Sequence, residues 1–277
     1  MSPTIFEIIL LAAVLHALWN AIVKAGDNTL LTTVLVTASA ALWAAILLPV
    51  LPSPNPASWP YIAISAALQV VYFTLVARIY RVADMSQTYP IMRGAAPLIV
   101  AIAGTVFLGE NLSSRAWLGI FIICSGILMM LWTEGQKSLQ GLMLALLNAL
   151  IISGYTLVDG VGVRLSAAPA SYTLWIFLIT GATIACWAAF TQWANTRQYL
   201  RTNWHLGAVG GFGTLVSYGL ALYAMTKAPV AVVAALRETS ILFSAVISWL
   251  ILKEHITCTR LVSVCVIAAG AITLRLA

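Results

Sequence analysis

Long apolar blocks, separated by short polar or proline-rich segments, fill almost the whole chain. Each block is close to the ~20 residues that an α-helix needs to cross a bilayer. The expected spans are 4–23, 30–51, 59–77, 86–108, 114–132, 139–158, 170–194, 204–226, 229–252 and 258–274. A proline-rich run at 49–56 separates the second span from the third. The pattern predicts an all-α membrane protein with ten transmembrane helices and no separate soluble domain.

The composition agrees with lipid as the solvent. Of 277 residues, 62% are hydrophobic and 8% are charged, whereas a soluble domain carries roughly 25% charged residues. This excludes a water-soluble enzyme and a DNA-binding domain. The formal net charge of +6 comes from basic residues scattered between the apolar blocks, which indicates membrane topology rather than a nucleic-acid partner. We expect a multi-pass protein of the cell inner membrane, a monomer or weak dimer, with lipid and a small molecule as its partners.

Signatures of cofactors and catalysis are absent from the sequence. It contains no phosphate-binding loop, no zinc-protease motif and no nucleophile elbow. The four cysteines lack CxxC spacing and read as buried hydrophobic residues. We therefore expect no cofactor, no metal and no enzyme, with a membrane-embedded enzyme or a passive channel as the rival classes.

The two halves of the chain repeat each other. At a shift of 144 residues, Arg93 falls on Arg237 and Glu110 falls on Glu254, and such coincidences are informative because charges are scarce. At a shift of 132, the first spans of the halves also match. We predict two five-helix units, 1–135 and 136–277. Because five is odd, the second unit enters the membrane inverted, as in many secondary transporters.

Three segments carry a resemblance to a known family. The runs at 18–24 (LWNAIVK), 108–112 (LGENL) and 252–256 (LKEHI) resemble signatures of the EamA-like family of the drug/metabolite transporter superfamily. The resemblance implies ten helices, no ATPase activity, and export or exchange of small metabolites, often amino acids. These motifs say little about the substrate.

Three charged residues lie well inside predicted spans. Arg93 is about seven residues into its block, and Arg237 and Glu238 are about eight into theirs, or roughly 10–12 Å along the helix axis. A charge at the centre of a lipid-facing helix costs at least ~2.5–3.5 kcal/mol of insertion free energy. These side chains should therefore face the bundle interior or a water-filled cavity. The arginines would bind an anionic group, and Glu238 an ammonium group or a proton. The alternative is an ion pair between Glu238 and either arginine; Arg237 is the poorer partner because adjacent helical residues point about 100° apart.

Other polar residues complete the predicted substrate site: His16, Asn20, Gln69, Tyr89 and Tyr218. His16 and Glu238 are the candidates for proton coupling. Each of these residues has an alternative role in interhelical hydrogen bonding or core packing. Glu110 and Glu254 lie at helix ends, where we expect capping rather than substrate binding.

The sequence favours a secondary active transporter for a small anionic or zwitterionic metabolite, working by alternating access. Efflux of hydrophobic cations, or flipping of a lipid-linked substrate, remains the alternative. Orientation is ambiguous. Eight Lys or Arg residues follow odd-numbered spans and four lie on the other side, which favours both termini outside the cytoplasm, whereas the family resemblance favours both inside.

Overall fold

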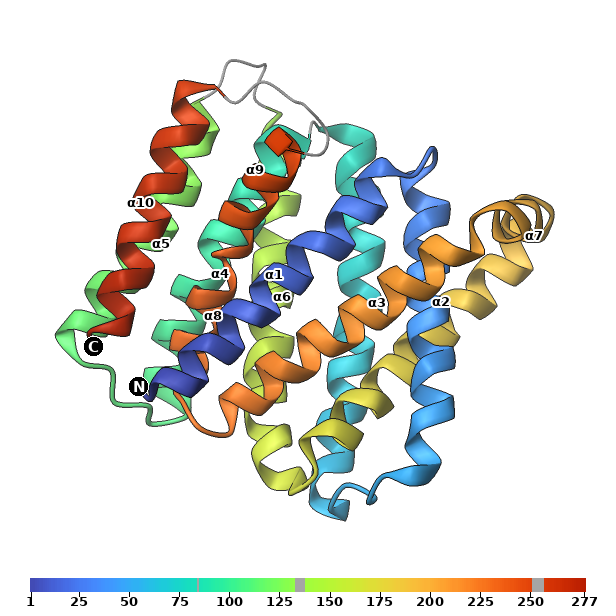
Figure 1. Cartoon of the computed structure of the whole chain (residues 1–277), viewed down its shortest axis with the longest axis horizontal. Coiled ribbons are helices and arrows are strands. Elements are labelled where there is room, and N and C mark those ends of the chain that lie inside the picture. Colours follow the sequence, from blue (N-terminus) through green and yellow to red (C-terminus); the bar gives the residue numbers. More distant parts are fainter. Residues whose placement is uncertain (84, 133–137, 251–256) are drawn as a thin grey trace.

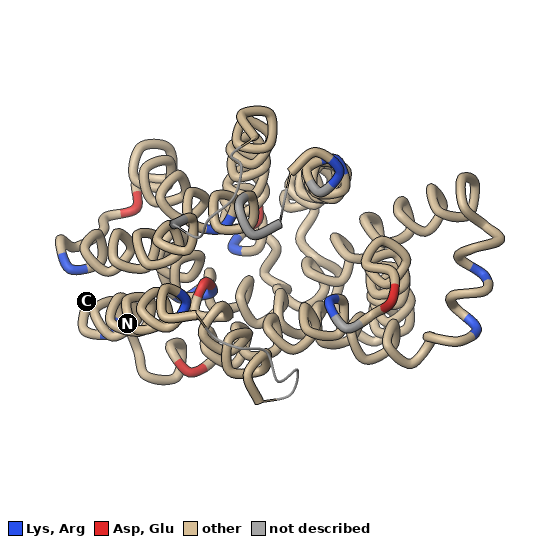
Figure 2. The backbone as a smooth tube through the Cα atoms, turned by 90° about the horizontal axis from the view of Figure 1, so that it is seen from above, with Lys and Arg blue, Asp and Glu red and all other residues tan. Residues whose placement is uncertain are grey.

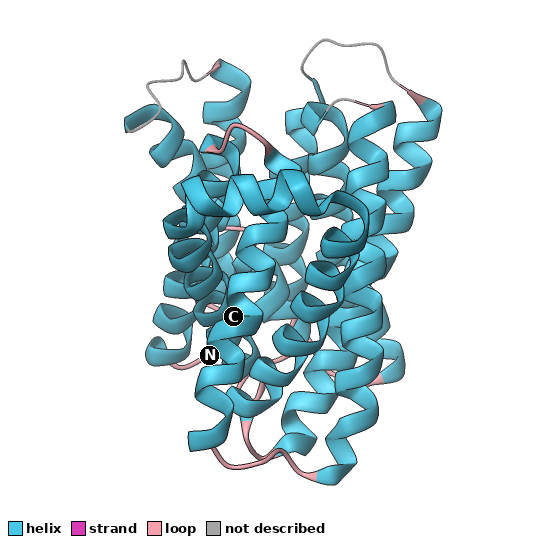
Figure 3. Ribbon diagram, turned by 90° about the vertical axis from the view of Figure 1, so that its right-hand side faces the viewer, coloured by secondary structure: helices cyan, strands magenta, loops and turns pink. Residues whose placement is uncertain are grey.

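The computed structural model describes residues 1–83, 85–132, 138–250 and 257–277, and every regular element in these ranges is a helix (Figure 1 and Figure 3). The α-helices, in chain order, are α1 (Pro3–Ala25), α2 (Thr29–Leu47), α3 (Trp59–Val82), α4 (Met85–Phe107), α5 (Ser114–Leu128), α6 (Leu139–Ser166), α7 (Pro169–Met225), α8 (Val230–Arg237), α9 (Ser240–Leu250) and α10 (Cys258–Arg275). The short 3₁₀ helices are η1 (Leu48–Val50), η2 (Pro56–Ser58) and η3 (Met129–Trp132).

Within the described ranges, nine helical stretches are long and apolar enough to cross a membrane, with α8 and α9 counted as one. The prediction of an all-α, multi-pass membrane protein is thus confirmed. Charged positions are sparse along the chain (Figure 2). Side chains as large as Phe107 and Phe190 are 81% and 91% exposed, as lipid-facing positions would be.

The predicted spans at 170–194 and 204–226 belong to one bent helix. At 57 residues, α7 would be about 85 Å long if straight, far more than the ~30 Å of a hydrocarbon core. Gln192 and Asn203 leave the helical region of backbone dihedral space, and the chain folds back on itself there (Figure 1). We call residues 169–191 the first arm and 204–225 the second arm. No proline or glycine lies between them, so a helical linker continues through a segment that the polar pattern had marked as a loop.

Glycines set the close packing of α2 on the second arm of α7. A Cβ atom added to Gly211 would lie 2.7 Å from the Ala40 backbone nitrogen, and one added to Gly207 would lie 2.5 Å from the Leu35 side chain. Such distances exclude any larger residue without movement of the helices. The small residues thus let the backbones of α2 and the second arm approach closely.

Helix ends follow the capping residues for the most part. The Ser113 hydroxyl accepts the Ala116 N–H at 3.1 Å and caps the start of α5. In contrast, α6 runs to Ser166, where Ala167 adopts a left-handed conformation (φ 54°). This is eight residues beyond the predicted end at 158, because the apolar pattern resumes after Asp159. That extension places Asp159 inside the helix. The predicted cap residue Glu254 lies outside the described residues.

Candidate functional site

The centre of the site is a break in the helix that follows residue 229. The structure ends α8 at Arg237 and begins α9 at Ser240, where the sequence predicts one continuous span. Glu238 N–H and Thr239 N–H donate to carbonyls three residues back, and the Thr239 hydroxyl also donates to the Leu236 carbonyl at 2.6 Å. A hydroxyl that competes for a backbone carbonyl weakens the α-helical ladder. Broken helices of this kind are used by transporters to build sites within the membrane.

Arg93 on α4 and Glu238 at this break form an ion pair. Arg93 Nε lies 2.8 Å from Glu238 Oε2, and the two side chains are 12% and 7% exposed. The cross-helix ion pair considered from the sequence is therefore present. It joins α4 to α8 across the interior of the bundle.

Arg237 turns to a different partner. Its guanidinium carbon lies 5.0 Å from the centre of the Tyr218 ring, on the second arm of α7. A guanidinium over an aromatic face is attracted by the ring quadrupole, and the attraction grows where water is excluded. The expectation that the neighbours Arg237 and Glu238 find separate partners is confirmed.

The charged groups of this centre keep unused hydrogen-bonding capacity. Among the described residues, buried donors of this centre that lie outside the ion pair and have no hydrogen-bond partner are Arg93 Nη2 and Arg237 Nε. Two guanidinium groups and one carboxylate also leave one positive charge in excess. Buried donors that lack acceptors, together with excess positive charge, suit a bound anion.

His16 and Asn20 approach the same region from α1. The charges of Arg93 and Arg237 both act on His16, whose ring packs edge-on against Trp19 with centroids 5.2 Å apart. Asn20 donates to the carbonyl of His16 at 2.7 Å. Its amide is therefore used within its own helix in this structure.

The remaining predicted residues lie on α3 and α4. The charges of Arg93 and Glu238 act on Tyr89, so Tyr89 belongs with the charged centre. Gln69 donates to the Ser65 hydroxyl at 3.3 Å and lines a separate small pocket. Of the predicted residues, the structure brings together His16, Tyr89, Arg93, Tyr218, Arg237 and Glu238, and leaves Asn20 and Gln69 at the margin.

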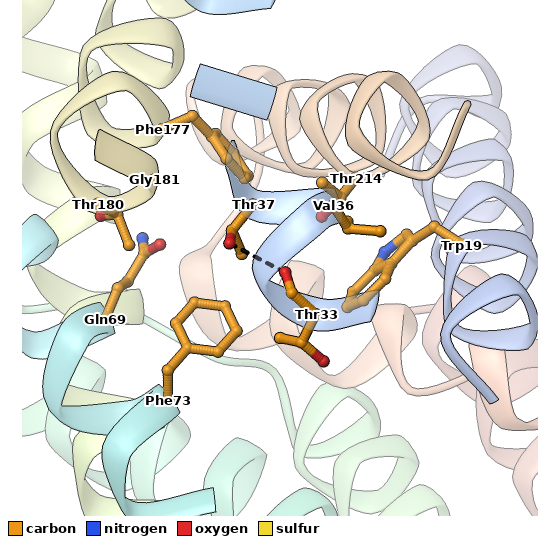
Figure 4. Close-up of a pocket in the computed structure, with 10 residues that line it drawn as sticks. All are labelled: Trp19, Thr33, Val36, Thr37, Gln69, Phe73, Phe177, Thr180, Gly181 and Thr214. Carbon is orange, nitrogen blue, oxygen red and sulfur yellow. Dashed lines mark hydrogen bonds between the residues drawn. The ribbon is translucent and has the colours of Figure 1, made fainter. Parts of the chain in front are cut away.

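The small pocket lies between α1, α2, α3 and both arms of α7 (Figure 4). It has a volume of about 30 Å³, which is room for one or two waters. Its lining mixes aromatic rings and hydroxyls: Trp19, Thr33, Val36, Thr37, Gln69, Phe73, Phe177, Thr180, Gly181 and Thr214. Trp19 Nε1 and Thr180 Oγ1 are buried with no hydrogen-bond partner in the described part of the chain. Trp19 connects this pocket to His16 and so to the charged centre.

Asp159 is a buried charged residue that the sequence interpretation did not place in the site. It is fully buried on α6. Tyr172 donates to its Oδ1 at 3.0 Å and Tyr218 donates to its Oδ2, and the Ser65 hydroxyl lies nearby. Tyr218 thus joins Asp159 to Arg237. Because the predicted span ended at residue 158, Asp159 was not assigned to the helix interior. Extending the apolar pattern to residue 163 would have placed it there.

A second Arg–Glu pair lies at the other end of α8. Arg164 Nη2 is 3.0 Å from Glu110 Oε1, and the same oxygen accepts the Val230 N–H at 2.9 Å. Arg164 also donates to the carbonyls of Met225 and Ala228. The expected capping role of Glu110 is confirmed, although the helix that it caps is α8 from the other half of the chain.

These features define an α-helical, multi-pass membrane protein with a charged interior. The EamA-like transporter family matches residues 6–132 and again 139–276. The chain therefore belongs to the EamA-like transporter family, a branch of the drug/metabolite transporters. No curated protein sequence matches it. A solved structure described as "Crystal structure of protein" shares the fold, with a TM-score of 0.78 and 17% identity over 100% of this chain and 98% of that chain.

Proposed function

We propose that this transporter moves a small metabolite with an anionic group, either an anion or a zwitterion, by alternating access. The observation that carries the proposal is the pair of guanidinium groups, one beside Glu238 and one over Tyr218, whose buried Arg93 Nη2 and Arg237 Nε donors lack acceptors. Arginine presents a planar fork that matches carboxylate, phosphate or phosphonate oxygens. Glu238 is placed to receive an ammonium group if the ligand is a zwitterion. His16, Tyr89 and Tyr218 line the same site, while Asn20 and Gln69 become contacts if the cavity opens toward Trp19.

The packing of the two halves supports alternating access between inverted repeats. Helix α1 packs on α9, and α6 packs on α4, so the first helix of each half contacts the fourth helix of the other half. The fifth helices, α5 and α10, pair with each other (Figure 1). With α7 crossing twice, the chain would make ten crossings as two inverted five-helix units, divided near residue 136. The charged centre lies on α4 and α8, where movement of one half against the other would open it to either side.

The alternative function, efflux of hydrophobic cations, would use the aromatic side chains around Tyr218 and the carboxylate of Glu238. The excess positive charge of the centre disfavours that function, because a cation would meet two guanidinium groups at close range.

Transport by purified protein in liposomes tests the proposal. A panel of radiolabelled anionic, zwitterionic and cationic metabolites is offered under an imposed pH gradient, with protein-free liposomes as the control. We expect uptake of compounds that bear a carboxylate, phosphate or phosphonate, and competition among them. Movement of hydrophobic cations alone would establish the efflux function instead, and chemical conversion of a compound would establish an enzyme.

A further inference from the structure

Asp159 is the buried acid that the proposed anion site does not use. It is fully buried, about seven residues from the end of α6, or roughly 10 Å. The hydrogen-bond partners of its carboxylate are the hydroxyl groups of Tyr172 and Tyr218, on the two arms of α7, and the Ser65 hydroxyl on α3 lies nearby. None of these partners is a cation. A buried carboxylate that meets only neutral donors keeps much of the cost of burying a charge, and binding a proton removes that cost.

The net charge of the neighbouring charged centre affects whether Asp159 binds this proton. Arg93, Arg237 and Glu238 together carry one excess positive charge. While the anion site is empty, an ionised Asp159 balances that charge, because Tyr218 connects it to Arg237. An anionic ligand on the arginines balances the same charge itself. An ionised Asp159 then becomes a surplus negative charge, so binding of the anion favours protonation of Asp159.

We propose that Asp159 is the proton-binding residue of the transporter, and that a proton on Asp159 and an anionic group on Arg93 and Arg237 bind and cross the membrane together. This inference rests on the proposed transport function. On the loading side, an Asp159 oxygen takes a proton from water. On the releasing side the O–H bond breaks and the proton returns to water, so no electrons are exchanged and no other reactant is needed.

The other titratable groups around Asp159 are less suited to this role. Glu238 is held beside Arg93 at 2.8 Å, so its carboxylate already has a cation as a direct partner. His16 is exposed to the charges of two arginines, where a third positive charge is repelled. The groups that face Asp159 are Tyr172 and Tyr218 on α7, Tyr155 on α6 and Arg237 on α8, while Tyr61 on α3 reaches Tyr172. Asp159 is thus the acid in this group without a cation in direct contact.

Infrared spectroscopy of the reconstituted protein tests proton binding without any substrate. The C=O band of a protonated carboxylic acid is followed as the pH is varied. We expect a titrating band that is absent in Asp159→Asn, retained in Glu238→Gln and unchanged in Asp27→Asn, whose carboxylate is exposed. Loss of the band in Glu238→Gln with its retention in Asp159→Asn would overturn the assignment.

Transport in two modes tests the coupling. With a panel compound that the wild-type protein moves, accumulation driven by a pH gradient is compared with exchange of labelled for unlabelled compound in the absence of a gradient. We expect Asp159→Asn to lose gradient-driven accumulation about tenfold or more while it retains exchange. Asp159→Glu, which keeps the carboxyl group, should restore part of the accumulation and serves if the amide variant does not fold.

The direction of proton movement completes the test. In wild-type vesicles that contain a pH-sensitive dye, the lumen should acidify as an anionic compound enters. Gradient-driven accumulation that survives in Asp159→Asn, or protons that move against the compound, would overturn the inference. If the wild-type protein moves no panel compound in either mode, the proposed function fails, while the infrared band still reports whether Asp159 binds a proton.

Discussion

The two ends of α8 carry the same pair of residue types and use them differently. At its N-terminal end, Glu110 Oε1 receives both the Arg164 guanidinium and the Val230 N–H, and the charges balance one to one. At its C-terminal end, Arg93 pairs with Glu238 while Arg237 lies over the Tyr218 ring, so two guanidinium groups accompany one carboxylate, and Arg93 Nη2 and Arg237 Nε have no acceptor. Among the described residues Glu110 Oε2 also lacks a hydrogen-bond partner, so the two ends differ in their donors and in their charge. A neutral cluster whose buried donors have acceptors stabilises a fold, whereas unfilled buried donors with excess positive charge can bind an anionic ligand. Charge balance and donor satisfaction therefore separate the structural pair from the binding centre.

The largest expected effect is at the C-terminal end of α8. Arg237→Ala should reduce transport about 30-fold or more, because a buried charged partner of the ligand is removed. Arg93→Lys should also reduce transport strongly, since it keeps the charge beside Glu238 but loses the planar fork. Initial transport rates in liposomes, normalised to inserted protein, measure both effects. Arg201→Ala, at an exposed position, is the matched control. Normal transport by both site variants would refute the anion site.

At the N-terminal end of α8, the expected effect is on stability. Glu110→Ala removes the acceptor of the Val230 N–H and the anionic partner of Arg164, which keeps two carbonyl acceptors, and should cost about 2 kcal/mol, with a smaller loss for Glu110→Gln. Thermal unfolding in detergent measures the change. Transport per folded molecule should stay within about twofold of wild type on this argument, since no ligand contact is removed. A selective loss of transport with unchanged stability would show that the two ends of α8 are not distinct in function.

A packing substitution far from both pairs separates stability from function. Gly211→Ala drives a Cβ to 2.7 Å from the Ala40 nitrogen and should destabilise the protein by about 1–3 kcal/mol. Gly213→Ala, whose Cβ would meet Trp19 at an ordinary 3.6 Å, is the control and should be nearly neutral. The comparison of their unfolding temperatures checks the packing of α2 on α7. Equal stability of the two variants would contradict it.

The smallest effect is expected at Tyr218, which connects Arg237 to Asp159. Tyr218→Leu removes the ring from Arg237 and should weaken ligand affinity about three- to tenfold, as expected for loss of a cation–π contact. Tyr218→Phe keeps the ring and should leave affinity within about twofold by the same argument. Apparent affinity from the concentration dependence of exchange distinguishes the two variants. Equal losses would mean that the hydroxyl, and not the ring, supports Arg237.

Much of the architecture follows from the sequence because lipid imposes it. An apolar block of about twenty residues must be a helix, since no water is present to satisfy its backbone. The depth of Arg93, Arg237 and Glu238 within such blocks was sufficient to predict a shared charged interior. Helix continuity was harder to predict. The linker between the arms of α7 stays helical, and the break at Glu238 depends on a hydroxyl that any helix interior can tolerate.

The sequence by itself determined the solvent, the class of fold and the scarce charges that lipid cannot accept. Only the tertiary structure decided which partner each charge has, because partners come from helices far apart in the chain. Arg93 meets Glu238 across 145 positions, and Tyr218 meets Asp159 across 59. The sequence pattern shows that burying these charged residues costs free energy. Which partners offset that cost depends on which helices pack together.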